Sequence, residues 1–141
     1  MNIIFVGLSG VPCLRRACDV RLMAFANAYI KIGYNVYIFN RHPVKKTEEI
    51  KLDQPYNENI QFIEVINKDK PENRALYIFV RLISYIIEFC KISKFNRKVK
   101  INFIQVYSWH YFEFVLYKFL AKVIHAKIIY QYVEFTSEIK R

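Results

Sequence analysis

Three short segments carry the side chains best suited to ligand chemistry, and each follows an apolar run of the sequence. They are residues 7–19, 107–111 and 133–138. Guanidinium groups bind phosphate, an aromatic face can pack against a sugar, and a carboxylate can accept hydrogen bonds from hydroxyls. These segments predict a site for a sugar or phosphate ligand, with the candidate residues Gly7, Ser9, Gly10, Arg16, Asp19, Arg21, Ser108, Trp109, His110 and Glu134.

The first segment differs from the known glycine-rich phosphate loops. A dinucleotide fingerprint requires GxGxxG, and the positions of its second and third glycines hold Ser9 and Pro12. A P-loop is excluded because the chain has no GxxxxGK[ST] sequence. The segment is also longer than a tight dinucleotide-binding turn, and it leads into Arg15, Arg16 and Arg21. It therefore favours a phosphate-bearing or carbohydrate ligand over a nicotinamide cofactor, and no cofactor is expected in this chain.

His110 and Glu134 each allow a structural and a functional interpretation. His110 could act as a base or hydrogen-bond donor beside Trp109, or it could be an ordinary structural histidine. Glu134 could contact a ligand or lie at a hinge, or it could be a solvated charge. His42, His110 and His125 lack metal-ligand spacing, so no metal is expected, and no catalytic residue is assigned.

Short apolar runs and helical periodicity alternate along the chain. Strands are predicted at 3–6, 36–39, 60–65, 103–107 and 127–133, and helices at 19–32, 72–95 and 111–124. Asp19 is predicted to cap the first helix and Gly33 to end it, and its apolar stripe would consist of Leu22, Phe25, Ala26 and Tyr29. Residues 40–59 are polar and predict a surface loop.

This alternation predicts an α/β fold: a Rossmann-like parallel sheet of about five strands with helices on both faces. In such sheets ligands bind outside the carboxyl ends of the strands. The segments 7–19, 107–111 and 133–138 are therefore expected to share one edge of the sheet.

The composition is that of one globular domain, with 141 residues of which 54% are hydrophobic and 24% are charged. No apolar stretch reaches the roughly 18 residues that span a bilayer. The N-terminal sequence also lacks the features of a signal peptide, so a cytoplasmic protein is expected. Cys13, Cys18 and Cys90 form neither a disulfide framework nor a zinc motif, and we expect reduced, mostly buried thiols.

The net charge of +10 indicates an anionic partner: nucleic acid, an anionic membrane surface or a phosphorylated small molecule. Segment 72–100 has apolar residues interrupted by Arg81, Glu88 and two lysines, and it can be interpreted in two ways. It could be a helix packed on the sheet, or an amphipathic membrane contact. We favour packing, with peripheral contact to the inner membrane through the basic end, which contains Lys91, Lys94, Arg97, Lys98 and Lys100. Nucleic acid is not expected, because no RRM, HTH or KH pattern is present.

Three segments together resemble a known enzyme family. The stretch from Asp19-Val20-Arg21 to Gly33-Tyr34-Asn35-Val36 is similar to a D-x-R-V…A-x-x-L…G-Y-x-V motif. Residues 102–110 (NFIQVYSWH) resemble D-V-I-H-x-H-x-W/L, and residues 126–130 followed by Glu134 resemble A-K-L-V-Y-D-x-H-E. In this order the motifs are similar to those of GT-B glycosyltransferases, especially the large retaining, family 4-like group that builds bacterial surface polysaccharides.

The resemblance implies that residues 1–141 are a single, incomplete N-terminal, acceptor-side half of a GT-B fold, without the donor-binding C-terminal domain. The histidines of the family fall on Gln105 and Tyr107, and its Asp and His after the fifth strand fall on Gln131 and Val133. The acidic position is retained as Glu134. These departures imply that the isolated chain is inactive.

The expected function is acceptor binding in a glycosyltransferase. A sugar would move from a nucleotide-sugar donor, held by the missing domain or a partner subunit, to a glycan or a polyprenyl-diphosphate-linked acceptor. Two alternatives remain open: a non-catalytic basic module that contacts a membrane or a partner, and a nucleotide-binding oxidoreductase domain.

Overall fold

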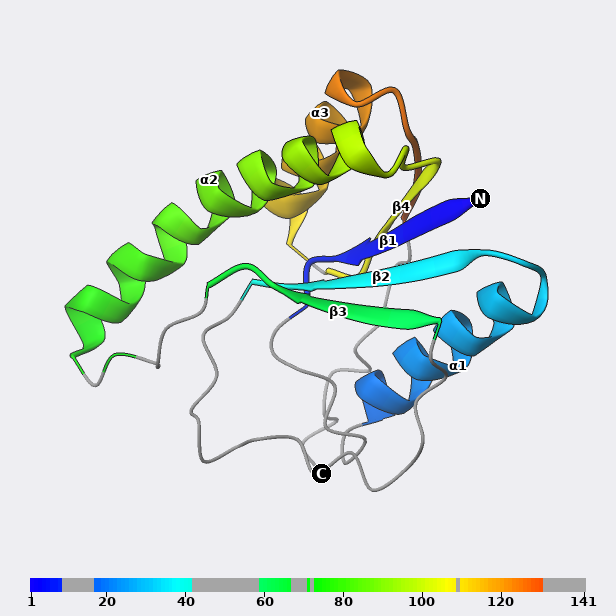
Figure 1. Ribbon diagram of the computed structural model, residues 1–141. Coiled ribbons are helices and arrows are strands. Elements are labelled where there is room, and N and C mark those ends of the chain that lie inside the picture. The colour runs from blue at the N-terminus through cyan, green and yellow to red at the C-terminus, as the bar shows by residue number, and fades with distance from the viewer. Residues whose placement is uncertain (9–16, 42–58, 67–70, 72, 109, 131–141) are drawn as a thin grey trace.

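The computed structural model describes residues 1–8, 17–41, 59–66, 71, 73–108 and 110–130. Its strands form one five-stranded sheet in the order β3-β2-β1-β4-β5, and every strand pair is parallel. The predicted α/β, Rossmann-like fold is therefore confirmed (Figure 1). The elements are β1 (Asn2–Val6), α1 (Ala17–Lys31), β2 (Asn35–Asn40), β3 (Ile60–Glu64), α2 (Arg74–Lys98), β4 (Phe103–Val106), α3 (Tyr111–Val123) and β5 (Lys127–Tyr130).

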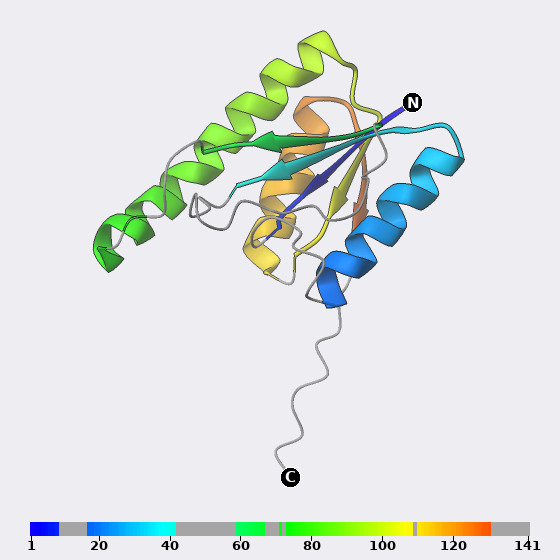
Figure 2. The same ribbon diagram turned by 60° about the horizontal axis from the view of Figure 1, so that its bottom comes forward.

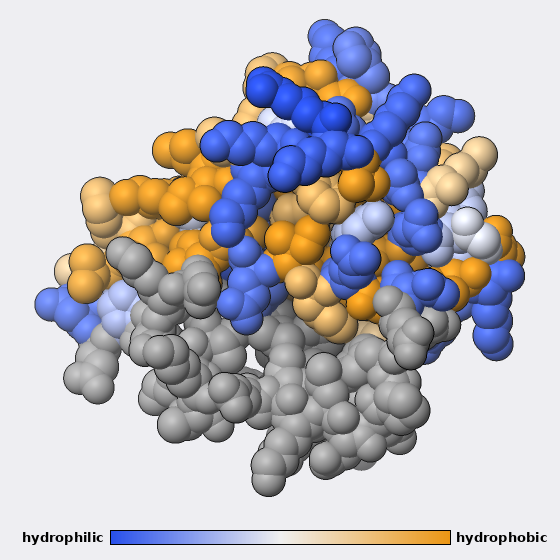
Figure 3. Space-filling view, in the orientation of Figure 1, coloured by the Kyte–Doolittle hydropathy of each residue, from blue (hydrophilic) through white to orange (hydrophobic). Residues whose placement is uncertain are grey.

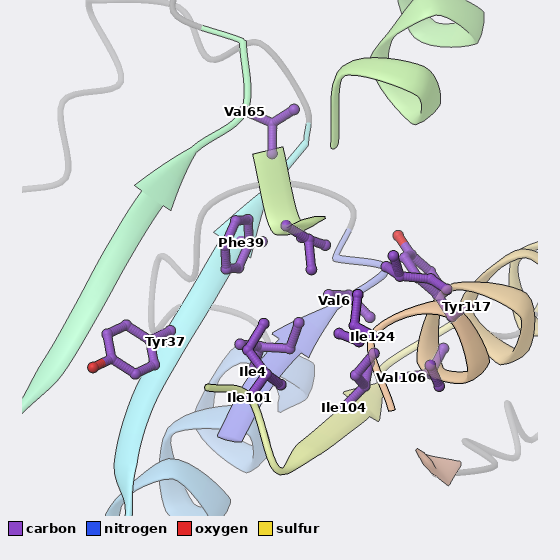
Figure 4. Close-up of a cluster of buried hydrophobic side chains, with 13 residues drawn as sticks. Ile4, Val6, Tyr37, Phe39, Val65, Ile101, Ile104, Val106, Tyr117 and Ile124 are labelled. Atoms are coloured by element: carbon purple, nitrogen blue, oxygen red, sulfur yellow. The ribbon is translucent and has the colours of Figure 1, made fainter. Parts of the chain in front are cut away.

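Helices cover both faces of the sheet, as predicted. α1 packs on one face, and α2 and α3 pack on the other (Figure 2). Ile3 and Phe5 of β1 belong to the core on the α1 side, whereas Ile4 and Val6 belong to the core shown in Figure 4. All four side chains are fully buried, as a parallel strand covered on both faces requires.

The first helix differs from its prediction in two details. It begins at Ala17, so Asp19 lies within its first turn and is not the cap. An acidic residue is favourable at either place, because both lie close to the positive end of the helix dipole. Phe25 is 37% exposed and Met23 is buried instead, so the predicted apolar stripe was wrong at that position. Gly33 ends the helix with a φ of +86°, which a glycine adopts readily.

The long helix α2 begins two residues later than predicted. Asn73 is its N-cap, and the side-chain oxygen accepts hydrogen bonds from the backbone N–H groups of Ala75 (2.9 Å) and Leu76 (3.4 Å). The helix then continues to Lys98, three residues past the predicted end. Its buried residues start only at Ser84, and its first turns extend beyond the carboxyl ends of the strands in both ribbon views.

Asparagine side chains connect the strands at the amino edge of the sheet. Asn2 donates through its backbone N–H to Asn102 Oδ1 and through its amide to the carbonyl of Lys100, both at 2.8 Å. Asn35 donates to Asn2 Oδ1 at 2.9 Å. These bonds tie the start of β1 to the starts of β2 and β4 and leave the carboxyl edge as the place for a site.

Candidate functional site

The strand order of the sheet reverses between β1 and β4, so their carboxyl ends lie at its topological switch point. From β1 the chain builds β2 and β3 on one side, and it then returns to build β4 and β5 on the other. Crevices at such switch points are the usual ligand sites of open α/β sheets. Gly7 follows β1 and Ser108 lies just beyond β4, so two of the three predicted segments meet here.

Gly7 is packed tightly against this junction. Its φ is +79°, and a Cβ at this position would lie 3.0 Å from Ser108 Cβ and 3.4 Å from a Glu113 carboxylate oxygen. Residues with a side chain rarely adopt this backbone conformation, and a Cβ would require Ser108 to shift by a few tenths of an ångström. Glycine is therefore favoured here by both conformation and space.

The remaining predicted residues are only partly described. His110 precedes α3 as its N-cap residue and is partly buried, and its backbone N–H donates to Ser108 Oγ at 3.1 Å. Ser108 is buried, and Arg21 is exposed on α1, which also contains Asp19. Ser9, Gly10, Arg16, Trp109 and Glu134 lie outside the described residues, so their predicted roles remain predictions.

A buried network of charged and phenolic side chains lies directly behind this junction. We call it the Arg41 network: Arg41, which follows β2, Tyr85 and Glu88 of α2, and Glu113 and Tyr117 of α3. Arg41 is 1% exposed and donates from Nη2 to Glu113 Oε1 at 2.6 Å and from Nη1 to Glu88 Oε2 at 3.3 Å. The network thus joins one strand end to both helices of this face.

The two tyrosines complete the network. Tyr117 accepts a hydrogen bond from Arg41 Nη1 at 2.9 Å and donates to Glu88 Oε2 at 2.8 Å. Tyr85 donates to Glu113 Oε1 at 2.6 Å, and the Arg41 guanidinium lies 3.8 Å from the centre of its ring. Both phenols have a raised pKa, chiefly because burial disfavours their charged form. They therefore act here as neutral hydrogen-bonding groups.

The surroundings shift the pKa values of the two carboxyl groups, Glu88 and Glu113, in opposite directions. Burial raises the pKa of Glu88 to about 7, although Arg41 and the Tyr117 hydroxyl favour its charged form. Burial also acts to raise the pKa of Glu113, but Arg41 and hydrogen bonds from Ser108 and Tyr85 hold it below its usual range. Among the described residues, Glu88 Oε1 has no hydrogen-bond partner, so this buried oxygen receives no donor that would favour the charged form.

The charges of the network therefore balance near neutral pH. Burial acts to lower the pKa of Arg41, but the surrounding phenols and carboxylates raise it by more than burial lowers it. The pKa is therefore above its usual value, and the guanidinium stays charged. Arg41 pairs with an ionised Glu113, while Glu88 can take up or release a proton. Because the network is buried, it is suited to holding the junction in place: Glu113 accepts from Ser108, which neighbours Gly7.

The sequence analysis missed this network for an identifiable reason. Arg41 was predicted to lie in a polar surface loop, but it is buried; residues 42–58 of that loop lie outside the described part of the chain. Glu88 was interpreted as a polar interruption of a helix, yet it is 1% exposed. A signal did exist: Glu88 and Glu113 are the only acids of α2 and α3, and Glu88 falls on the same stripe as Ser84 and Ile92.

Other predictions about ligands can be assessed only over the described residues. Within them, no group of three or more histidine, cysteine or acidic side chains could hold a metal ion, and none of the helices is long and apolar enough to cross a membrane. Cys90 is a free thiol but is exposed, so the expectation of buried cysteines was wrong at this position. Cys90 lies on the side of α2 that faces away from the sheet, and this side also has exposed apolar residues that take no part in the core.

Comparison of the chain with models of protein families and with curated proteins finds no match.

Proposed function

We propose that this chain is the acceptor-binding part of a glycosyltransferase with a GT-B-like organisation. It would bind a glycan or a polyprenyl-diphosphate-linked sugar at the carboxyl edge of its sheet. The nucleotide-sugar donor would be held by a second domain or a partner subunit, so the chain alone would not transfer sugar.

One observation carries this proposal: the segments after β1 and β4 meet at the switch point of the sheet, with Gly7 against Ser108. Both segments belong to the candidate site, and Ser108 also belongs to a stretch that resembles a glycosyltransferase motif. Sites of this kind use backbone N–H groups and small side chains to approach phosphate or sugar oxygens closely. The missing GxGxxG sequence argues against a dinucleotide at the same place.

The Arg41 network supports the proposal because it holds the junction of Gly7 and Ser108 in place. Glu113 accepts hydrogen bonds from Arg41, Tyr85 and Ser108, so the junction is fixed to α2 and α3. A rigid supporting shell of this kind reduces the ordering that ligand binding would otherwise require. None of these network residues is assigned a catalytic role.

The test is a titration of the ¹⁵N-labelled chain, followed by NMR. The probe is a hexosyl diphosphate that carries a single five-carbon prenyl group, and prenyl alcohol controls for the tail. We expect chemical shifts to change at the amides of Gly7, Leu8 and His110, with the amides of Gly33 and Lys100 at the amino edge as internal controls. The acceptor site would be refuted if chemical shifts changed only at the amino edge. It would also be refuted if NAD bound saturably at the carboxyl edge and the probe did not bind.

A transfer assay tests the second half of the proposal. The purified chain is incubated with nucleotide sugars and the same probe, and product is measured by mass spectrometry. No glycosylated probe is expected. Turnover by the chain alone would show that the donor site is not supplied by another domain or subunit.

A further inference from the structure

α2 has large apolar side chains on the side that faces away from the sheet. Ser84, Glu88 and Ile92 form its buried stripe. Phe79, Leu82 and Ile86 lie on the other side at a spacing of three and four residues, and they are 59%, 62% and 66% exposed. A helix that only packs on a sheet would have polar residues on this outer side.

α3 continues the same outer surface. Phe112, Val115 and Phe119 are exposed and follow one another at helical spacing. The two helices meet in the middle of α2, where Tyr85 contacts Phe112 edge-on at 5.7 Å and Phe89 stacks on Phe119 at 6.0 Å between ring centres. We call the combined area the outer α2–α3 surface, defined by Phe79, Leu82, Ile86, Phe112, Val115 and Phe119.

This surface is large for an exposed apolar area. With the further exposed residues Leu76, Ile83 and Val123, it includes nine large apolar side chains that are 36–66% exposed. Exposed apolar residues that gather in this way mark an interaction site, whereas single exposed apolar residues are normal on a protein surface. Figure 3 shows hydrophobic side chains over the N-terminal part of α2 and hydrophilic ones over its C-terminal end.

The exposed charged side chains of α2 and α3 are all basic. Glu88 and Glu113 are the only acidic residues of α2 and α3, and both are buried on Arg41. The basic residues of the two helices are largely at the surface: Arg74, Lys91, Lys94, Arg97, Lys98, Lys118 and Lys122 are exposed. Lys94 and Arg97 continue the outer side of α2 toward its C-terminus, and Lys118 and Lys122 flank the apolar stripe of α3.

We infer that the outer α2–α3 surface docks onto an anionic lipid bilayer, with its apolar side chains at the acyl boundary and its lysines and arginines among the headgroups. Apolar residues flanked only by cations are the pattern of interfacial helices, because long basic side chains can reach anionic headgroups while their stems stay apolar. A second copy of the chain is a poor occupant, because a two-fold contact would bring these same cations together.

Membrane docking does not depend on the proposed acceptor site, but it has a geometric connection with it. Tyr85 contacts Phe112 at the surface and donates to Glu113 in the network, so the carboxyl edge of the sheet lies beside the outer surface. The basic residues that the sequence analysis assigned to membrane contact include Lys94 and Arg97 on the outer side. Lys91 instead donates to the carbonyl of Glu64 at 3.0 Å, on the flank toward β3. The apolar stripes, which the sequence analysis assigned to packing, are the larger part of the contact.

The test measures the partition of the chain onto vesicles by flotation. Vesicles of phosphatidylcholine with 30% phosphatidylglycerol are compared with pure phosphatidylcholine. We expect at least about 30-fold stronger partition onto the anionic vesicles, because several cations contribute roughly fivefold each. The variant Lys94→Gln/Arg97→Gln should reduce it about 30-fold, at roughly fivefold for each cation near the surface. The matched control, Lys31→Gln/Lys127→Gln, removes two exposed lysines elsewhere and should partition as the original chain does.

The apolar part is tested in the same assay. Phe79→Ser/Leu82→Ser/Ile86→Ser should lower partition by at least about 100-fold. Its control, Val20→Ser/Ile32→Ser, changes one exposed apolar residue of α1 and one that directly follows it, and should have no effect. Circular dichroism verifies that all variants fold. The inference is refuted if the triple variant binds as well as its control. Absence of vesicle binding, with a dimer or an acidic protein bound through this surface instead, would also refute it.

This experiment and the NMR titration can fail separately. The titration is done without vesicles and reads out the carboxyl edge, and the flotation is done without sugar ligand and reads out the outer surface.

Discussion

Replacing Glu88 by Gln should make the stability of the protein depend on pH in a different way. Glu88 is buried against Arg41 and Tyr117, and burial raises its pKa from 4.5 to about 7. A glutamine has nearly the shape of a protonated glutamic acid and cannot ionise. The variant therefore imitates the low-pH form of the original protein at every pH.

The magnitude follows from the linkage between proton binding and folding. Because the pKa of Glu88 is higher in the folded state, its favourable contribution is complete below pH 4.5 and is lost as the pH rises through 7. At 1.36 kcal/mol per pH unit, the shift from 4.5 to about 7 corresponds to a loss on the order of 3 kcal/mol. The new amide N–H in place of Glu88 Oε1 has no partner among the described residues. It costs about 1–3 kcal/mol at every pH.

The assay is urea unfolding of both proteins at pH 5, 6, 7 and 8. We expect the stability of Glu88→Gln relative to the original protein to rise steadily over this range, with most of the change by pH 8. Glu64→Gln, at an exposed position, should give a constant difference and serves as the control. Glu113→Gln should give a nearly constant difference over pH 5–8, because the lowered pKa of Glu113 stabilises the fold fully above about pH 4.5 and this contribution is lost only as the pH falls below that value. A constant difference for Glu88→Gln would refute the buried, proton-holding carboxyl group.

Three further predictions test the site and the outer surface. Arg41→Met should lower the free energy of unfolding by about 3–5 kcal/mol at pH 7, because Glu113 keeps a buried charge without its partner; a loss below 1 kcal/mol in urea unfolding would contradict the network. Gly7→Ala should cost about 1–3 kcal/mol more than Gly33→Ala, because both glycines have positive φ but only Gly7 would crowd Ser108; equal unfolding midpoints would contradict this packing. The Cys90 thiol, exposed beside the outer α2–α3 surface, should react readily with a maleimide and at least about tenfold more slowly on anionic vesicles, measured by mass spectrometry against Cys90→Ser; equal rates would contradict docking through this surface.

The sheet could be predicted from sequence because its determinants are local. Ile3 to Val6 form a continuous apolar run, as a strand buried on both faces requires, and Gly33 supplies the left-handed residue that ends α1. The alternation of strands and helices then implied parallel crossovers and two covered faces. The meeting of Gly7 and Ser108 followed from that topology alone.

The Arg41 network could not be predicted because it depends on the packing of three distant segments. A charge in a helix is usually solvated, and nothing near Glu88 in the sequence indicates that Arg41, 47 residues away, reaches it. The outer surface was misinterpreted for a related reason. Periodicity identifies apolar residues of a helix, but the sequence does not say which of them face the sheet, so all the apolar residues of segment 72–100 were assigned to packing.

The position of β1 between β2 and β4 has a consequence for how the protein forms during synthesis. β1 pairs with β2 soon after both leave the ribosome, but its other edge must wait for Phe103 to Val106, about a hundred residues later. During that interval a growing chain exposes the backbone of an apolar strand, such as Ile3 and Phe5, to any extended segment nearby. Contacts so distant in sequence slow folding. The nascent chain therefore most needs protection, for example by a chaperone, while the second edge of β1 is still unpaired.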